Sequence, residues 1–329
     1  MHFDKVGRRE FIAVIGGAAA WPLSVRAQSP AKAYRVGFLG VFSHAEYQSL
    51  VDAMRGRLRQ LGYEEGKNLI IEYRWADGRY DQLPRLAGEL VQINVDVIVT
   101  HSTPGALAVK QATSTVPIVV AAVGDPIDIG LVPSLARPGA NLTGLTFFYA
   151  EVGAKRVELL KEAIPALSRV AVFVNPANRG NWRALELVKR ATSALSVRLV
   201  PIEVKERDDI AAAVGMAAER AQGLLVIEEP LFISNVRHVA DLALRHRLPM
   251  IGFRPYGQAG ALLEYGADLV DLYSRSALLV DKILKGTPPA DLPIERAVKF
   301  ELVINLKSAK TLGIELPATL LARADEVIE

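Results

Sequence analysis

The stretch Pro117-Ile118-Val119-Val120-Ala121-Ala122-Val123-Gly124-Asp125-Pro126 decides the fold of this chain. It is an unbroken apolar run, rich in valine, too short for a typical helix and bounded by prolines. Such a run predicts a strand that is buried on both faces of a parallel sheet. In open α/β sheets, ligands bind at the carboxyl ends of strands. Asp125 is therefore the first candidate for a group that contacts a ligand.

Strands and amphipathic helices alternate on both sides of this run. In the first half, further buried strands are predicted at 34–40, 68–74 and 96–100. After an extended piece over 142–148 the pattern restarts, with strands at 169–174, 197–204, 223–227 and 249–253. The second series repeats the layout of the first, including the proline before its last strand. The sequence therefore predicts an α/β fold of two similar, doubly wound parallel-sheet lobes.

The segments outside these two series are too small for a third domain, so they must pack back on the lobes. We predict that the first lobe holds residues 28–145 plus 262–292, and the second 146–261 plus 293–329. The chain then crosses between the lobes three times, and we place these crossings at 143–146, about 253–262 and about 293–299.

Residues 1–27 have the three parts of a bacterial export signal. Arg8 and Arg9 precede an apolar run, and Ser24-Val25-Arg26-Ala27 offers small residues before a cleavage site. The paired arginines favour the twin-arginine route, while the ordinary secretory route remains open. We expect cleavage after about Ala27 and a periplasmic protein; the alternative is a buried N-terminal helix.

Composition narrows the function classes. The 329 residues carry a formal net charge of +3 and contain no cysteine, which excludes disulfides, thiolate metal sites and thiol nucleophiles. Removing residues 1–27 leaves a net charge of +1, so no basic surface for nucleic acid is expected. We predict a monomer with no nucleic-acid partner.

The usual cofactor and catalytic motifs are missing from the sequence. It has no glycine-rich dinucleotide or phosphate loop, no zinc-protease motif and no nucleophile elbow, and its five histidines show no metal-ligand spacing. Polar residues at the strand ends lack a paired nucleophile and base. We therefore expect no cofactor, no metal and no enzymatic activity.

Polar and aromatic residues gather instead at the predicted carboxyl ends of the strands. Hydroxyls and helix N–H groups near Ser102 and Thr103 suit a carboxylate, whereas Asp125 or Glu229 suits an ammonium. Aromatic rings near the same edge suit an apolar ligand body. The candidate ligand-binding residues are Phe42, Ser43, His44, Ser102, Thr103, Asp125, Asn175, Asn178, Glu229, Phe253 and Tyr265.

Each candidate also has a simpler structural explanation. Asp125 before a proline can initiate a turn, Ser102 and Thr103 can cap a helix, and the two asparagines can shape a loop. Phe42 and Phe253 can pack between the lobes. Glu228 and Glu229 are adjacent, so at most one is expected to face a given crevice, and Arg156 is expected on a solvated helix face.

Several motifs resemble one group of ABC-transporter substrate-binding proteins, the tryptophan/tyrosine-type binding proteins of bacterial importers. The resemblance covers essentially the whole chain after residue 27. Its motifs are Val123-Gly124-Asp125-Pro126, the run from Gly130 to Gly139, Asn141-Leu142-Thr143-Gly144, His246-Arg247-Leu248-Pro249, the run from Lys299 to Lys307 and the run from Leu320 to Ile328.

This resemblance implies a type I periplasmic-binding fold with three crossing segments. It also implies capture of a small amino-acid-like ligand, aromatic ligands included, by hinge closure, and delivery to a membrane permease. The alternatives are an enzyme that acts on a small molecule in the same cleft, or a ligand-sensing subunit for a membrane receptor.

Overall fold

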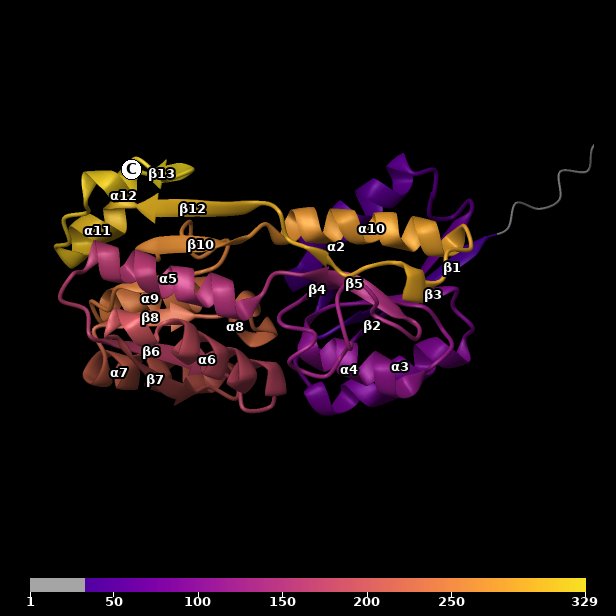
Figure 1. Ribbon diagram of the computed structural model, residues 1–329, viewed down its shortest axis with the longest axis horizontal. Coiled ribbons are helices and arrows are strands. Elements are labelled where there is room, and N and C mark those ends of the chain that lie inside the picture. The colour runs from indigo at the N-terminus through magenta and orange to yellow at the C-terminus, as the bar shows by residue number, and fades with distance from the viewer. Residues whose placement is uncertain (1–32) are drawn as a thin grey trace, which may run out of the picture. The chain divides into compact units, whose positions relative to one another are not determined.

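The computed structural model describes residues 33–329, which form one compact unit. The export signal expected at 1–27, and residues 28–32 of the predicted first lobe, lie outside the described residues. Two sheets, each covered by helices on both faces, build this unit (Figure 1).

The first sheet has the strand order β11-β5-β4-β3-β1-β2, and all its pairs are parallel. Its strands are β1 (Tyr34–Gly40), β2 (Leu69–Trp75), β3 (Val97–Thr100), β4 (Ile118–Val123), β5 (Leu142–Thr146) and β11 (Glu295–Arg296). Every residue of β4 is buried, which confirms the expected strand with two covered faces.

Helices cover both faces of this first sheet. On one face α2 (His44–Gln60) packs against α10 (Leu269–Leu284), and on the other α3 (Leu83–Gln92) packs against α4 (Ser102–Ala112) (Figure 1). Two short 3-10 helices, η1 (Tyr80–Gln82) and η4 (Pro289–Asp291), lie in the connections.

The second sheet has the order β13-β12-β10-β9-β8-β6-β7. Its strands are β6 (Arg169–Val174), β7 (Arg198–Glu203), β8 (Gly223–Val226), β9 (Met250–Gly252), β10 (Leu263–Ala267), β12 (Phe300–Asn305) and β13 (Glu326–Ile328). Only the β10–β12 pair is antiparallel.

Seven α-helices in the described part of the chain belong to this second sheet. They are α5 (Tyr149–Ala163), α6 (Arg179–Ala191), α7 (Ile210–Arg220), α8 (Pro230–Ser234), α9 (Val236–Arg245), α11 (Leu306–Leu312) and α12 (Ala318–Leu321). The 3-10 helices are η2 (Ser193–Leu195) and η3 (Arg207–Asp209).

The two sheets share one topology. The order β2-β1-β3-β4-β5 in the first corresponds to β7-β6-β8-β9-β10 in the second. This confirms the predicted α/β fold of two similar parallel-sheet lobes.

The chain passes between the sheets three times. The crossings follow β5, β10 and β11, and lead into α5, α10 and β12. We call the two parts the first lobe (33–146 and 269–296) and the second lobe (149–267 and 300–329).

These lobe limits differ from the predicted ones in two places. Residues 263–267 pair with β9 and β12 in the second sheet, whereas they were expected in the first lobe. Residues 295–296 pair with β5 in the first sheet, whereas they were expected in the second lobe. Sequence pattern identifies a strand, but it does not say which sheet the strand joins.

The second crossing was also expected too early, at 253–262. That segment turns within the second lobe, where the backbone N–H of Gly257 donates to Glu264 and the Tyr256 hydroxyl donates to the carbonyl of Phe232. The chain leaves this lobe only after β10.

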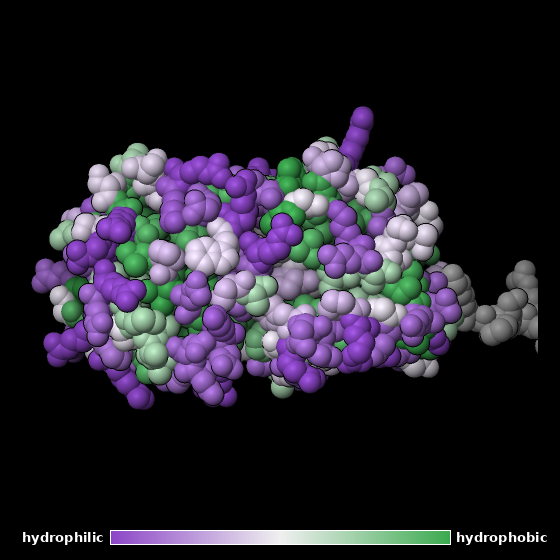
Figure 2. Space-filling view, turned by 90° about the horizontal axis from the view of Figure 1, so that it is seen from below, coloured by the Kyte–Doolittle hydropathy of each residue, from purple (hydrophilic) through white to green (hydrophobic). Residues whose placement is uncertain are grey.

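Polar and apolar side chains are mixed over the face shown in Figure 2. Within residues 33–329 no helix is both long and apolar enough to cross a membrane, and no cluster of three or more potential metal-ligating side chains occurs.

Candidate functional site

A small cavity lies between the two lobes, near the carboxyl edges of both sheets, and we call it the inner cavity. Its volume of about 30 Å³ leaves room for about two water molecules. The first lobe lines it from α2, β4, the start of α4 and α10, and the second from the start of α5 and from the loop and helix after β8, with Phe147 between them in the first crossing. The lining residues are Tyr47, Leu50, His101, Ser102, Ala122, Phe147, Tyr149, Glu228, Pro230, Ile233, Leu269 and Tyr273.

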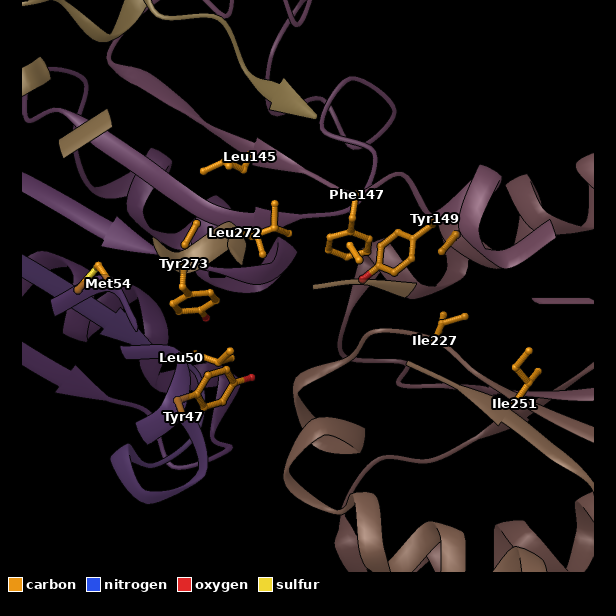
Figure 3. Packing of buried hydrophobic residues seen from close by; sticks show 14 of the residues in the cluster. Tyr47, Leu50, Met54, Leu145, Phe147, Tyr149, Ile227, Ile251, Leu272 and Tyr273 are labelled. Carbon is orange, nitrogen blue, oxygen red and sulfur yellow. The ribbon is translucent and has the colours of Figure 1, made fainter. Parts of the chain in front are cut away.

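Three hydroxyl groups at the inner cavity are buried and have no hydrogen-bond partner: those of Tyr47, Ser102 and Tyr273. In Figure 3 Tyr47 extends from a first-lobe helix toward the side of Tyr149, and Tyr273 extends from another first-lobe helix toward Leu50 and Tyr47. Burial raises the pKa of both Tyr47 and Tyr273 well above the usual tyrosine value, so both hydroxyls stay protonated. A buried hydroxyl without a partner costs roughly 1–3 kcal/mol. The first lobe thus presents unused hydrogen-bonding capacity to this cavity.

Ser102 also has a strained backbone. Its φ of 60° lies in the left-handed region, which a residue other than glycine occupies at a cost of roughly 1–3 kcal/mol. It is the first residue of α4, so its hydroxyl sits beside the free N–H groups of a helix start. Thr103 follows, and its hydroxyl is likewise buried without a partner, although it does not line the inner cavity.

His101, the residue before Ser102, is buried and also lines the inner cavity. Burial lowers its pKa to about 3, so the imidazole is neutral. Its Nε2 accepts a hydrogen bond from the backbone N–H of Val41 at 3.3 Å, which leaves the ring proton on Nδ1. The ring packs against Tyr47, with 4.4 Å between centroids, and so fixes one wall of the cavity.

Asp125 is buried at the end of β4, but it does not line the inner cavity. Its carboxylate accepts a hydrogen bond from the backbone N–H of Tyr149 at 3.1 Å, at the start of α5. Burial raises its pKa to about 6. In this structure Asp125 therefore joins the end of β4 to the first turn of α5, across the first crossing.

Glu228 lines the inner cavity, but its charge is already balanced. The fully buried guanidinium of Arg156 donates to both of its carboxylate oxygens, one at 2.9 Å, and also to the carbonyl of Tyr265. The expectation that Arg156 lies on a solvated helix face is wrong. Its position in α5 faces the sheet, and the partner carboxylate comes from 72 residues further along the chain.

Glu229 is fully buried beside Glu228 and collects four donors. Asn175 and Asn178 donate from their side-chain amides at 2.8 and 2.6 Å, and the Leu231 backbone donates at 3.4 Å. The fourth donor is the hydroxyl of Tyr80, which comes from the first lobe. Burial raises the pKa of Glu229. The structure thus brings three predicted candidates together, with a fourth residue that the sequence analysis missed.

A second, larger space opens between the lobes, and we call it the outer cleft. Its volume is about 1260 Å³, and charged side chains of both signs line it from both lobes. Phe42 and Ser43 border it, together with Tyr80, Asn175 and Ile233. Ile233 also borders the inner cavity, so it stands between the two spaces.

The predicted site residues not yet placed lie elsewhere, whereas Ser43, which borders the outer cleft, also caps α2 through Glu46. His44 is exposed on α2, edge-on to Trp75. Phe253 is buried within the second lobe against Tyr256, and Tyr265 stacks on Phe300. The structure does not place His44, Phe253 or Tyr265 along either space.

The tyrosines at positions 47, 80, 149 and 273 were not among the predicted site residues. Three of them lie at helical positions whose spacing is that of an ordinary apolar face. These tyrosines come from helices that are distant in sequence, and no signal in the sequence indicates that the fold brings them to the same region.

The chain matches the model of a protein family described as ABC transporter substrate binding protein, over residues 35–328. The chain belongs to this family. A tyrosine-binding protein from Clostridioides difficile is 26% identical over 281 residues, which cover 84% of this chain and 81% of that protein.

Solved structures show the same fold. An ABC domain in complex with L-Trp from Streptococcus pneumoniae is 24% identical to this chain. The match has a TM-score of 0.84 and covers 90% of this chain and 100% of that one. A ligand-free, open substrate-binding protein from Clostridium difficile is also 24% identical, over 90% of this chain and 99% of that one, with a TM-score of 0.65. A leucine-binding protein from Thermotoga maritima, with 11% identity and a TM-score of 0.59 over 77% of this chain and 83% of that one, shares this type I periplasmic-binding fold.

Proposed function

We propose that this substrate-binding protein captures a small amino-acid-like solute with an aromatic or apolar body, by closure of its two lobes, and delivers it to the permease of an ABC importer. The observation that carries the proposal is the set of three buried hydroxyls without partners, from Tyr47, Ser102 and Tyr273, around one interlobe cavity.

These hydroxyls and the first N–H groups of α4 can donate to a ligand carboxylate. The Glu228 carboxylate, although paired with Arg156, keeps lone pairs that can accept from an ammonium. The rings of Phe147, Tyr149 and Tyr273 offer apolar walls. Both ends and the body of an amino-acid-like ligand therefore have matching groups.

The inner cavity is too small to admit such a molecule while the lobes are in this arrangement. Entry thus requires the lobes to separate, which the three crossing segments permit. The higher TM-score against the L-Trp complex than against the open structure, at equal identity, supports a closed arrangement here.

An extracytoplasmic location follows from the same proposal, with the export signal expected at residues 1–27. The family and the matched structures consist of solute-binding proteins, which supports binding without chemical turnover.

The test is a thermal-shift screen of the purified protein, followed by calorimetry. The panel holds aromatic and branched-chain amino acids, aromatic acids, sugars and nucleosides. We expect a shift with aromatic amino acids or close analogues, and no chemical change of the ligand by mass spectrometry. A shift with sugars or nucleosides alone would contradict the amino-acid-like ligand, and turnover would contradict the binding role.

A further inference from the structure

Two polar side-chain pairs join the lobes away from the crossing segments, within residues 33–329. One is Arg183 with Asp128, an ion pair whose side chains are 38% and 34% exposed. The other is Tyr80 with Glu229. Exposed ion pairs contribute little to stability, whereas a hydrogen bond to a buried carboxylate contributes more.

The Tyr80–Glu229 bond has the geometry of a reversible contact. Asn175, Asn178 and Leu231, which supply the other donors to Glu229, all belong to the second lobe. Separation of the lobes would break the bond from Tyr80 and leave these donors in place. The carboxylate is therefore held ready in one lobe, and only one bond is lost on opening.

Tyr80 is also held ready in the first lobe. It begins η1, one residue after the turn at Asp77 and Gly78, and its ring meets Phe42 edge-on at 6.4 Å between centroids. Burial raises the pKa of Tyr80 well above the usual tyrosine value, so its hydroxyl remains a donor.

The bond lies beside the inner cavity but outside it. Neither Tyr80 nor Glu229 lines that cavity, whereas Tyr80 and Asn175 line the outer cleft. A group in this place can set how readily the lobes close without contacting a ligand inside.

We propose that Tyr80 and Glu229 form a latch that holds the lobes closed and thereby sets ligand affinity, as positioning residues; this inference rests on the proposed closure of the lobes. The latch keeps part of the ligand-free population closed. Because ligand affinity scales with the fraction of protein in the competent state, losing the latch weakens binding without removing a ligand contact.

The test uses interlobe distances measured by double electron–electron resonance without any ligand. The chain has no cysteine, so Ser49→Cys on α2 and Asp208→Cys on η3, both exposed, give two unique label sites. The labelled protein should show a short-distance population, and Tyr80→Phe should reduce its ratio to the long-distance population by about tenfold.

Tyr63→Phe is the matched control. It removes a 2.9 Å hydrogen bond from a tyrosine to Asp281, but both residues lie in the first lobe. It should lower the thermal midpoint and leave the distance distribution unchanged. Thermal unfolding of Tyr80→Phe, with one cooperative transition, verifies that this variant is folded.

An unchanged distance distribution in Tyr80→Phe would overturn the latch, and so would a single long distance in the labelled protein that lacks ligand. Because the measurement needs no ligand, the latch can fail while the ligand screen succeeds. Conversely, a distance shift with no ligand found in the screen would support the latch and contradict the ligand class proposed above.

Discussion

The two lobes present opposite polar chemistry where they meet. In the second lobe both carboxylates are satisfied from within that lobe, Glu228 by Arg156 and Glu229 by Asn175 and Asn178. In the first lobe the hydroxyls of Tyr47, Ser102 and Tyr273 are buried with no partner. At the inner cavity, therefore, the hydroxyls without partners all come from the first lobe; the second lobe buries Asn181 Nδ2 and Ser234 Oγ without partners, but neither residue lines this cavity.

Completed networks stabilise one fixed shape, whereas unmatched groups raise the free energy of the empty closed state. A ligand that satisfies the unmatched hydroxyls gains the bonds that the protein lacks on its own. On the proposed function, the second lobe provides a preformed wall of the site, and the first lobe supplies the hydrogen bonds that favour closure around a solute.

The largest expected effect comes from breaking a completed network. Arg156→Met leaves the Glu228 carboxylate buried without its partner, and breaking a buried ion pair costs about 3–5 kcal/mol. Chemical denaturation should show this loss in the free energy of unfolding. Adding Glu228→Gln to Arg156→Met should restore part of it, because the unpaired charge is removed.

Lys155→Met is the control for that experiment. Lys155 neighbours Arg156 in sequence, but its ion pair with Glu158 is exposed, and the change should stay within about 0.5 kcal/mol. Equal effects of Arg156→Met and Lys155→Met would show that the second-lobe network is not a stabilising unit.

A second prediction concerns pH. Burial raises the pKa of Asp125 to about 6 in the folded protein, from the ordinary aspartate value of 3.8. Below about pH 4 the Asp125 carboxyl is protonated in both the folded and the unfolded protein. Above about pH 6 it is charged in both, and the folded protein then bears the cost of burying the charge. Relative to Asp125→Asn, the native protein should therefore lose about 2–3 kcal/mol of stability as the pH rises from 4 to 7.

Parallel pH profiles of the two proteins would contradict that assignment. Asp125→Ala tests the separate expectation that Asp125 contacts a ligand, which predicts binding weaker by about tenfold or more. Unchanged affinity would leave Asp125 as the residue that joins β4 to α5.

A third prediction concerns close contact between the lobes. A Cβ atom on Gly180, in the first turn of α6, would lie 2.4 Å from the Thr103 hydroxyl oxygen and 3.0 Å from its Cβ. Gly180→Ala should hinder closure and weaken ligand binding by about tenfold. Alanine favours helix, so the stability of the second lobe should not fall.

Gly56→Ala on α2, where no atom lies within 4 Å of the added Cβ, is the matched control and should leave affinity unchanged. Thr103→Ala combined with Gly180→Ala should restore part of the affinity, because the 2.4 Å contact with the hydroxyl is removed while the 3.0 Å contact with the Cβ remains. Normal affinity in Gly180→Ala alone would mean that the lobes do not need this contact to close.

Regular features of the fold could be predicted from sequence because they depend on local pattern. The apolar run at 118–123 and its counterpart before Phe253 mark buried strands, and the repeated order of elements predicts two lobes. The sheet joined by 263–267 could not be predicted, because the pattern of a strand does not identify the strands it pairs with.

The candidate site was only partly predictable for a similar reason. Residues at strand ends, such as Asn175, Asn178 and Glu229, follow the rule for open α/β sheets and do meet. Tyr47 and Tyr273 lie on helices 226 positions apart in sequence, and each is indistinguishable from a core residue. Their importance depends on an absent partner, which is a property of the folded structure.

The most direct test of the account compares stability and binding in a variant that carries both Tyr47→Phe and Tyr273→Phe. Because both hydroxyls lack partners, the free energy of unfolding without ligand should rise by about 1 kcal/mol for each, while affinity for the ligand found in the screen should fall by about tenfold or more. Tyr63→Phe, which loses a bond to Asp281, should do the reverse on stability. A double variant that is less stable and binds normally would contradict the claim that the first lobe keeps these hydroxyls for a ligand.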